Sequence, residues 1–197
     1  MLTRIPAAAD RAAVVATLAA AFHDDPVMTF IFPDAADRRR RLPRLMAILF
    51  DGDGAHGARF MTEGGEAATL WRAPGQGALR WPEKLRHGLP WLHAAGLALP
   101  RALAVSAASD AAHPPEPHWY LHVVGCRPDA QGRGFGSAAI APGLARADAD
   151  GVAAYLETAN PRNLPLYERL GFAVTHEWRV PRGPHHWSLL RPARRSA

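Results

Sequence analysis

Hydrophobic and polar positions along the chain follow two spacings, one typical of helices and one typical of strands. Val14, Leu18 and Phe22 recur every four residues, which predicts the buried face of a helix that begins at Asp10, the residue placed to cap it. Short apolar runs between Gly, Pro and Asp residues predict strands instead. Strands are expected at residues 2–5, 59–63, 67–72, 119–126, 152–157, 173–180 and 186–190.

A second long helix is expected after Asp34, whose side chain would cap its N-terminus. Pro43 should kink this helix or mark a second start. The sequence Asp51-Gly52-Asp53-Gly54 resembles the beginning of a calcium loop but lacks the third acidic ligand and the closing Glu, so a turn is expected there. Further helices are expected at residues 27–32, around 83–97, at 100–109, after 137 and at 164–170.

One stretch combines a strand that begins at His118, a glycine-rich turn and an alanine-rich helix. The turn is Gln131-Gly132-Arg133-Gly134-Phe135-Gly136-Ser137. Its glycines permit positive φ and close approach of a ligand, and the N–H groups at the start of a helix can hold a phosphate or pyrophosphate. The pattern therefore predicts a binding site for an anionic cofactor.

Two well-known phosphate-loop patterns fit this turn poorly. A P-loop needs Gly-Lys-Ser/Thr, and Lys84 is the only lysine in the chain. The dinucleotide pattern G-x-G-x-x-A is met by residues 134–139, with Glu157 about 20 residues further on. However, residues 128–133 separate its first glycine from the strand, and the remaining chain is too short for several more βα units. A nucleotide oxidoreductase is therefore only a minor alternative.

A third pattern, Q/R-x-x-G-x-G/A, is satisfied by Gln131, Gly134 and Gly136. A strand, Asn160 and a short helix follow it at the appropriate separation, and that helix ends in Leu-Tyr-Glu-Arg-Leu-Gly-Phe at Phe172. Together these motifs resemble the two signatures of the GNAT N-acetyltransferase superfamily. Within the superfamily the chain is most similar to puromycin N-acetyltransferases, through residues 115–117, 156–158, 161–165 and 180–181 and, more weakly, 17–22.

The resemblance implies an α/β fold, with a mixed, twisted sheet of about seven strands, flanking helices and a helical insert before the fourth strand that walls a substrate pocket. It also implies acetyl-CoA, with its pantetheine arm between strands four and five. A strand-four N–H, of Val124 or Cys126, would donate to the oxyanion. The residues implied to contact the coenzyme are Val124, Gly125, Cys126, Gln131, Gly132, Arg133, Gly134, Phe135, Gly136, Ser137, Asn160 and Asn163.

The resemblance also implies catalytic candidates. Tyr167 is the expected general acid for the thiolate, with a packing tyrosine as the structural alternative. Glu157 is expected either to take the amine proton through a water, if burial raises its pKa, or to attract a cationic substrate at the rim. His122 shares a strand face with His118 and Tyr120, and it is either an alternative base or a core histidine.

The expected acceptor is a primary amine of a small molecule, with aminonucleosides and other antibiotics as candidates. Substrate contacts are expected from His23, Asp24 and Asp25, at the break after the first helix. Two other functions stay open: a non-catalytic acyl-CoA sensor with the same fold, and a protein or peptide N-acetyltransferase.

Length and composition narrow the setting. A chain of 197 residues is expected to form a single domain, residues 1–197. Its net charge of +5 suits a coenzyme with several phosphates, whereas no arginine cluster interleaved with aromatics predicts a nucleic-acid partner. Cys126 is the single cysteine, no apolar run is long enough to span a membrane, and the histidines lack metal-ligand spacing. A cytoplasmic monomer or homodimer without a metal is therefore expected.

Overall fold

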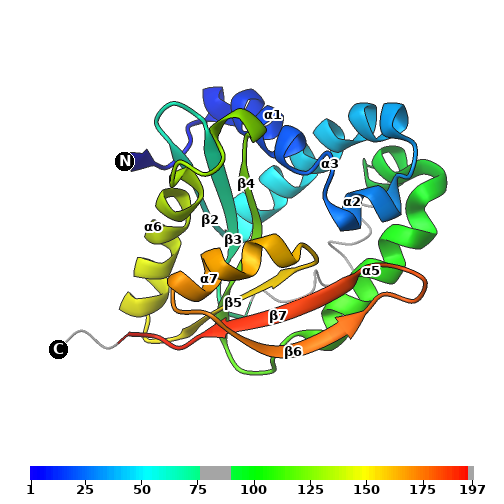
Figure 1. The fold of residues 1–197 in the computed structure, drawn as a ribbon. Helices are drawn as coiled ribbons and strands as arrows, with labels where there is room; N and C mark the ends of the chain where they lie inside the picture. The colour runs from blue at the N-terminus through cyan, green and yellow to red at the C-terminus, as the bar shows by residue number, and fades with distance from the viewer. Residues whose placement is uncertain (76–89, 195–197) are drawn as a thin grey trace.

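A seven-stranded sheet forms the centre of the protein in the computed structural model, which describes residues 1–75 and 90–194. The strand order is β1-β2-β3-β4-β5-β7-β6, with β4 and β5 parallel and every other pair antiparallel (Figure 1). The strands are β1 (Thr3–Arg4), β2 (Gly57–Thr62), β3 (Ala67–Arg72), β4 (His118–Cys126), β5 (Ala153–Thr158), β6 (Ala173–Arg179) and β7 (His185–Arg191). This mixed sheet confirms the expected fold class.

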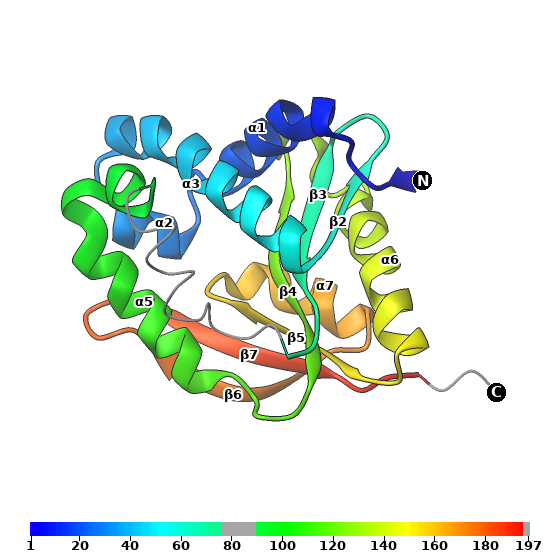
Figure 2. The ribbon, with the colours of Figure 1, turned by 180° about the vertical axis from the view of Figure 1, so that it is seen from behind.

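Helices cover both faces of the sheet and bury one apolar core on each. The helices are α1 (Arg11–Ala21), α2 (Pro26–Ile31), α3 (Ala35–His56), α5 (Leu99–Ala112), α6 (Phe135–Ala149) and α7 (Leu164–Arg169). Side chains of α1, α2, α3 and α5 share one core, whereas α6 and α7 pack into the other. Figure 2 shows α3 and α5 together on the face opposite α6. Within the described residues, no helix combines the length and apolar character needed to cross a membrane.

Two local predictions are wrong, and one of two alternatives is excluded. The helix α3 continues through Pro43, so Pro43 does not mark a second start. The helix also includes residues 51–54, where a turn was expected. Helical continuation places Asp53 against buried charged partners, so tertiary contacts outweigh the poor helix propensity of the two glycines. Asp10 does not cap α1 with its side chain. Its carboxylate instead accepts hydrogen bonds from Arg4, at 2.7 Å to Oδ1, and from the N–H of Ala7 at 2.7 Å.

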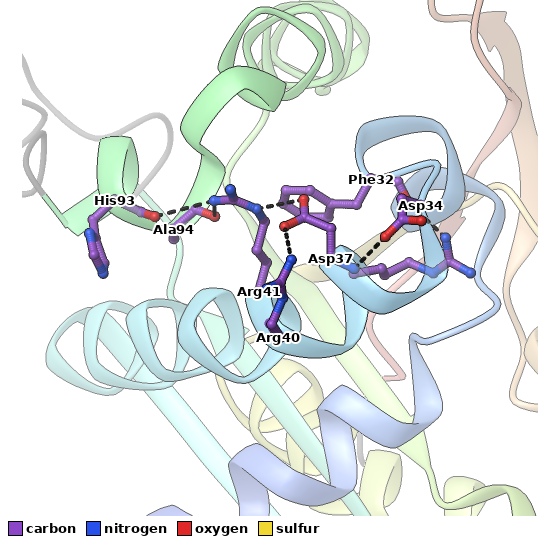
Figure 3. Close-up of polar contacts among 8 residues, drawn as sticks. Phe32, Asp34, Asp37, Arg40, Arg41, His93 and Ala94 are labelled. Atoms are coloured by element: carbon purple, nitrogen blue, oxygen red, sulfur yellow. Dashed lines mark hydrogen bonds and ion pairs between the residues drawn. The ribbon is translucent and has the colours of Figure 1, made fainter.

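The insert before β4 is attached to α3 by the Arg41 side chain. The predicted helix at 83–97 lies partly outside the described residues, and its described residues 90–95 are helical. Arg41 donates to the carbonyls of Ala94 at 2.9 Å and His93 at 3.4 Å, while its Nε donates to Asp37 at 2.7 Å (Figure 3). This connection holds residues 93–94 of the insert, and α5 follows them after a short 3-10 turn at Gly96–Ala98.

A bulge in β4 changes which face its side chains occupy. Leu70 of β3 pairs with Val123, but the next residue, Trp71, pairs with Leu121, so His122 is an extra residue in β4. Before the bulge, Leu121 packs in the core under α6. After it, Val123 packs in the core under α1.

The parallel pairing of β4 and β5 is short. It joins residues 118–121 to residues 153–156, so the second half of β4 has no strand beside it on the β5 side within the described residues. Figure 1 shows the two strands moving apart towards α7. This divergence leaves unpaired backbone groups along one edge of β4.

Candidate active site

Glu157 lies where β4 and β5 stop pairing, and three hydroxyl groups surround its carboxyl group. The side chain is only 8% exposed. Ser109 of α5 donates to Oε2 at 2.6 Å, Tyr155 donates to Oε1 at 2.7 Å, and Tyr120 donates to Oε2 at 3.5 Å. The Nδ1 atom of His113 is 3.7 Å from Oε1. Groups from α5, β4 and β5 therefore orient this carboxyl group together.

Burial raises the pKa of Glu157 to about 7, although the hydrogen bonds from Ser109, Tyr155 and Tyr120 oppose the rise. A carboxyl group with such a pKa can take up and release a proton near neutral pH, as a general base must. Burial, followed by the charge of Glu157, also raises the pKa of Tyr155. Tyr155 therefore remains a neutral hydrogen-bond donor.

His122 is part of a buried charged cluster with Asp53 of α3 and Arg72 of β3. Arg72 Nε donates to Asp53 Oδ1 at 2.7 Å, and His122 Nδ1 is 2.6 Å from Asp53 Oδ2. Arg72 Nη2 is 3.4 Å from His122 Nε2. Because a guanidinium group only donates, Nε2 is the acceptor and Nδ1 carries the hydrogen. Both ring nitrogens are engaged, so His122 is placed less well than Glu157 to accept a proton from a substrate.

The pKa values in this cluster agree with that arrangement. Burial, reinforced by the charge of Arg72, lowers the pKa of His122, so the ring is neutral at pH 7. Burial alone would raise the pKa of Asp53, but the interactions with His122 and Arg72 outweigh it and lower the pKa. Asp53 is therefore ionised, with Arg72 as its counterion.

Tyr167 of α7 is a buried residue, 3% exposed, and packs edge-on against Phe172. No residue in the described part of the chain hydrogen-bonds its hydroxyl group. Burial, followed by the charge of Asp25, raises the pKa of Tyr167, so the hydroxyl group keeps its proton. An uncommitted phenol is compatible with the expected role of a proton donor.

The three residues predicted to contact the substrate, His23, Asp24 and Asp25, differ in their exposure and their partners. The side chain of Asp24 is 87% exposed, and the ring of His23 is 3.8 Å from it. Asp25 is instead buried enough to raise its pKa, and it acts on Tyr167. Its Oδ1 atom accepts from the N–H groups of Val27 at 2.8 Å and Met28 at 3.2 Å. Its Oδ2 atom has no hydrogen-bond partner within the described residues.

The glycine-rich turn presents a series of free backbone N–H groups. Gly132 and Gly134 have φ values of 74° and 86°, a conformation that other residues rarely adopt. Gly134 immediately precedes α6, and the first backbone bond back to it comes from Ala138 at 3.1 Å. Within the described residues, no acceptor takes the N–H groups of residues 132–137. This arrangement suits an anion.

Gly136 points to a ligand at this turn. A methyl group built on Gly136 would meet only Leu166 Cδ2, at 4.0 Å, so packing within the protein does not require glycine there. We expect Gly136→Ala to leave stability unchanged or slightly higher, because Ala is the better helix former by up to about 1 kcal/mol. We expect it to weaken coenzyme A binding at least about tenfold, because the methyl group would occupy space near the phosphates.

Isothermal titration with coenzyme A and thermal unfolding would measure both effects. Gly52→Ala in α3 is the matched control, because a methyl group there meets nothing within 4 Å. Unchanged affinity in the Gly136 variant would contradict a phosphate site at this turn.

Of the other predicted coenzyme contacts, three lie on β4, and Gln131 and Asn160 lie shortly after β4 and β5. Val124, Gly125 and Cys126 form the part of β4 that has no β5 partner. Gln131 is turned back, with Nε2 donating to the Cys126 carbonyl at 3.2 Å. The side chain of Asn160 accepts from the N–H of Arg162 at 3.1 Å and so stabilises the local turn.

Several residues of the site were not found from the sequence. Asp53 was assigned to a turn, and Ser109, His113 and Tyr155 carried no motif. Ser109 and Glu157 are 48 residues apart, and Asp53 and His122 are 69 residues apart. The available signal was the alternation that places Tyr155 on the same strand face as Glu157.

Comparisons with known proteins agree with this geometry. The model of the Acetyltransferase (GNAT) family matches residues 81–172. An uncharacterised N-acetyltransferase of Schizosaccharomyces pombe is 32% identical over 181 residues, which are 84% of this chain and 71% of that protein. A mycothiol acetyltransferase of Streptomyces scabiei is 39% identical over 97 residues, which are 47% of this chain and 31% of that protein.

The fold has solved counterparts as well. A Corynebacterium glutamicum structure described as histone acetyltransferase HPA2 and related acetyltransferase has a TM-score of 0.70 and 24% identity, and covers 99% of this chain and 97% of its own. The identity with the Schizosaccharomyces pombe N-acetyltransferase, 71% of which this chain covers, and the match to the family model show that the chain belongs to the GNAT family of acetyltransferases. The finer likeness to puromycin N-acetyltransferases stays a proposal.

Proposed function

We propose that this protein transfers the acetyl group of acetyl-CoA directly to a primary amine of a small molecule. The observation that carries the proposal is Glu157. It is a buried carboxyl group with a pKa of about 7, at the point where β4 and β5 separate. A protonated amine must lose a proton before it can attack, and such a carboxyl group can accept that proton near neutral pH.

Two surfaces fit the coenzyme. The free N–H groups of residues 132–137 suit its pyrophosphate, and the unpaired edge of β4 at residues 124–126 suits an extended pantetheine arm. Asn163, whose side chain has no hydrogen-bond partner in the described part of the chain, is the proposed contact near the thioester. When bound, acetyl-CoA supplies the acetyl group in activated form.

The side chains of the protein divide the proton transfers between them. Glu157 accepts the proton of the amine, directly or through a water. Tyr167 holds a proton on its hydroxyl group for the leaving thiolate. The N–H of Val124 or Cys126 donates to the developing oxyanion, and Oδ2 of Asp25 attracts the cationic acceptor.

Mixing the purified protein with acetyl-CoA and a panel of amines, and measuring release of free thiol, tests the proposal. We expect thiol release with at least one small primary amine. Coenzyme A binding without turnover on any small amine or peptide would instead favour a non-catalytic acyl-CoA sensor. Turnover with peptides alone would favour a protein or peptide acetyltransferase.

Tyr167→Phe separates catalysis from binding. The substitution removes only the hydroxyl group, which has no partner among the described residues, so the packing around the ring should be kept. We expect kcat to fall about 100-fold while the affinity for coenzyme A stays unchanged, because a positioned acid contributes in that range. Steady-state kinetics and calorimetry measure the two quantities. A variant with wild-type kcat would assign Tyr167 a packing role only.

The identity of the acceptor is a further part of the proposal. An aminonucleoside or another amine-bearing antibiotic is favoured by the similarity of residues 156–158 and 161–165 to puromycin N-acetyltransferases. Growth of a sensitive host that expresses this chain, on puromycin and related amines, tests this choice. No protection by the wild-type protein, alongside clear thiol release with other amines, would reject the antibiotic and keep the reaction.

A further inference from the structure

We propose that Ser109 and Tyr155 are positioning residues for Glu157. Through Ser109, the insert helix α5 would help to orient the carboxyl group and to set its affinity for a proton. The inference rests on the proposed function, in which Glu157 is the base. It assigns a role to α5, which lies within the insert before β4.

The first argument is the direction of the hydrogen bonds around Glu157. Trp178 Nε1 can only donate, and it donates to Ser188 Oγ at 3.0 Å. Ser188 Oγ is 2.8 Å from the Tyr155 hydroxyl oxygen, to which it can donate in turn. Tyr155 then donates to Oε1 of Glu157 at 2.7 Å. In this series of hydrogen bonds from Trp178 to Glu157, each donated hydrogen therefore points towards the carboxylate.

Ser109 completes the set from the opposite side. It donates to Oε2 at 2.6 Å, so each carboxylate oxygen has one close hydroxyl donor. Such bonds favour the ionised form and oppose the effect of burial. Ser109 is therefore the contribution of α5 to keeping the base deprotonated near neutral pH.

The second argument is that the network can accommodate a proton. The Tyr155 hydroxyl oxygen is also 3.3 Å from the backbone carbonyl of Ala112, at the end of α5. When Glu157 takes up a proton on Oε1, the Tyr155 hydrogen can turn to that carbonyl. The Tyr155 oxygen can then accept a hydrogen bond from the protonated Glu157. The two hydroxyl hydrogens therefore do not point at each other.

The residue after the end of α5, His113, contacts both Ser109 and the tyrosines beside Glu157. His113 Nδ1 is 2.9 Å from the carbonyl oxygen of Ser109, and because a carbonyl oxygen only accepts, Nδ1 must carry the hydrogen. The ring of His113 packs edge-on against Tyr120 at 4.6 Å and against Tyr155 at 4.9 Å. These contacts hold Ser109 next to Glu157.

Several other titratable groups act on Glu157 or lie beside it. Tyr120 and Tyr155 approach from the sheet, Asp110 comes from α5, and His113 is the residue that follows this helix. Burial lowers the pKa of His113, so its ring is neutral near pH 7. The charge of Asp110 raises the pKa of Glu157 and so opposes its ionisation. Substitution of Ser109 leaves all four groups in place.

The test compares Ser109→Ala, Ser109→Thr and Ser106→Ala. Ser106 is an exposed residue on the same helix and serves as the control. Alanine favours helix formation, so both alanine variants should fold. Carbon-13 NMR of protein labelled at the glutamate carboxyl carbons follows the titration of Glu157 without any substrate, and Glu157→Gln assigns its signal.

We expect Ser109→Ala to raise the titration midpoint of Glu157 by about one pH unit, a tenfold change in proton affinity. Ser109→Thr, which keeps the hydroxyl group, and Ser106→Ala should stay close to the wild-type value. Tyr155→Phe should also raise the midpoint. In the thiol-release assay, the pH profile of kcat/KM for Ser109→Ala should shift by the same amount, with recovery of activity at higher pH.

Two outcomes overturn the inference: an unchanged midpoint in Ser109→Ala, or an equal shift in Ser106→Ala. Failure of the proposed function is recognised separately. If Glu157→Gln leaves acetyl transfer and its pH profile unchanged, Glu157 is not the base, whatever the NMR titrations show. If Glu157→Gln removes activity while Ser109→Ala titrates as wild type, only the role of α5 is rejected.

Discussion

Replacement of Glu157 by glutamine is expected to lower kcat/KM for the amine acceptor about 1000-fold, within the range measured for general bases. Glutamine has nearly the same shape, and its single carbonyl oxygen can still accept a hydrogen bond from either Ser109 or Tyr155, but it cannot take up a proton. The loss should therefore appear without a change in coenzyme A affinity.

The pH dependence gives this prediction a second signature. A base must be deprotonated in the free enzyme, so kcat/KM of the wild-type protein should rise with pH through about 7, the pKa of Glu157, and then level off. In the glutamine variant this rise of kcat/KM with pH should disappear. Glu168→Gln, on the exposed side of α7, is the matched control and should keep the wild-type profile. If the glutamine variant retained this rise, another residue would be the base.

Stability should change with pH in the same system. The pKa of Glu157 is raised in the folded protein from its ordinary value of 4.5 to about 7, so the protonated carboxyl group favours folding at low pH. This contribution is lost as the pH rises through about 7. Compared with the wild-type protein, Glu157→Gln should therefore gain stability between pH 4.5 and 7, as measured by urea unfolding at each pH.

Replacement of Asp53 by asparagine is expected to lower the free energy of unfolding by about 3 kcal/mol. The Asp53 side chain is 3% exposed, and it is the counterion of Arg72, whose side chain is 23% exposed. In the variant, Arg72 loses the negative charge of its partner at position 53. The amide oxygen of asparagine is also a weaker acceptor than a carboxylate for the Nδ1 hydrogen of His122. Urea unfolding near pH 7 measures the difference.

A control for this prediction lies in the same helix. Asp51 forms an ion pair with Arg11, but their side chains are 53% and 45% exposed, so Asp51→Asn should cost less than about 1 kcal/mol. Because the pKa of Asp53 is lowered in the folded protein, its contribution is present above about pH 4 and is lost as the pH falls through the lowered value. The gap between wild type and Asp53→Asn should therefore narrow in acid. Equal losses for the two variants would show that the buried charge pair adds little.

Local patterns in the sequence were sufficient for the elements of the fold. Short apolar runs between Gly, Pro and Asp residues predicted the strands of the sheet, because such residues end strands and begin turns. The turn at Gly132 and Gly134 was predicted because positive φ angles require glycine. These signals lie within a few residues of the features that they predict, so they can be read without knowledge of the remaining chain.

Only the tertiary structure decided which side chains meet. Asp53 lies in an Asp-Gly-Asp-Gly sequence whose local preference is a turn, yet contacts with Arg72 and His122 keep it in a helix. Ser109 comes from the insert, and its bond to Glu157 spans 48 residues of sequence. The proton affinity of a carboxyl group depends on the groups and the solvent around it in space, which sequence spacing does not encode. The sequence alone therefore determined the family and the glycine-rich turn, whereas the fold determined the environment of Glu157.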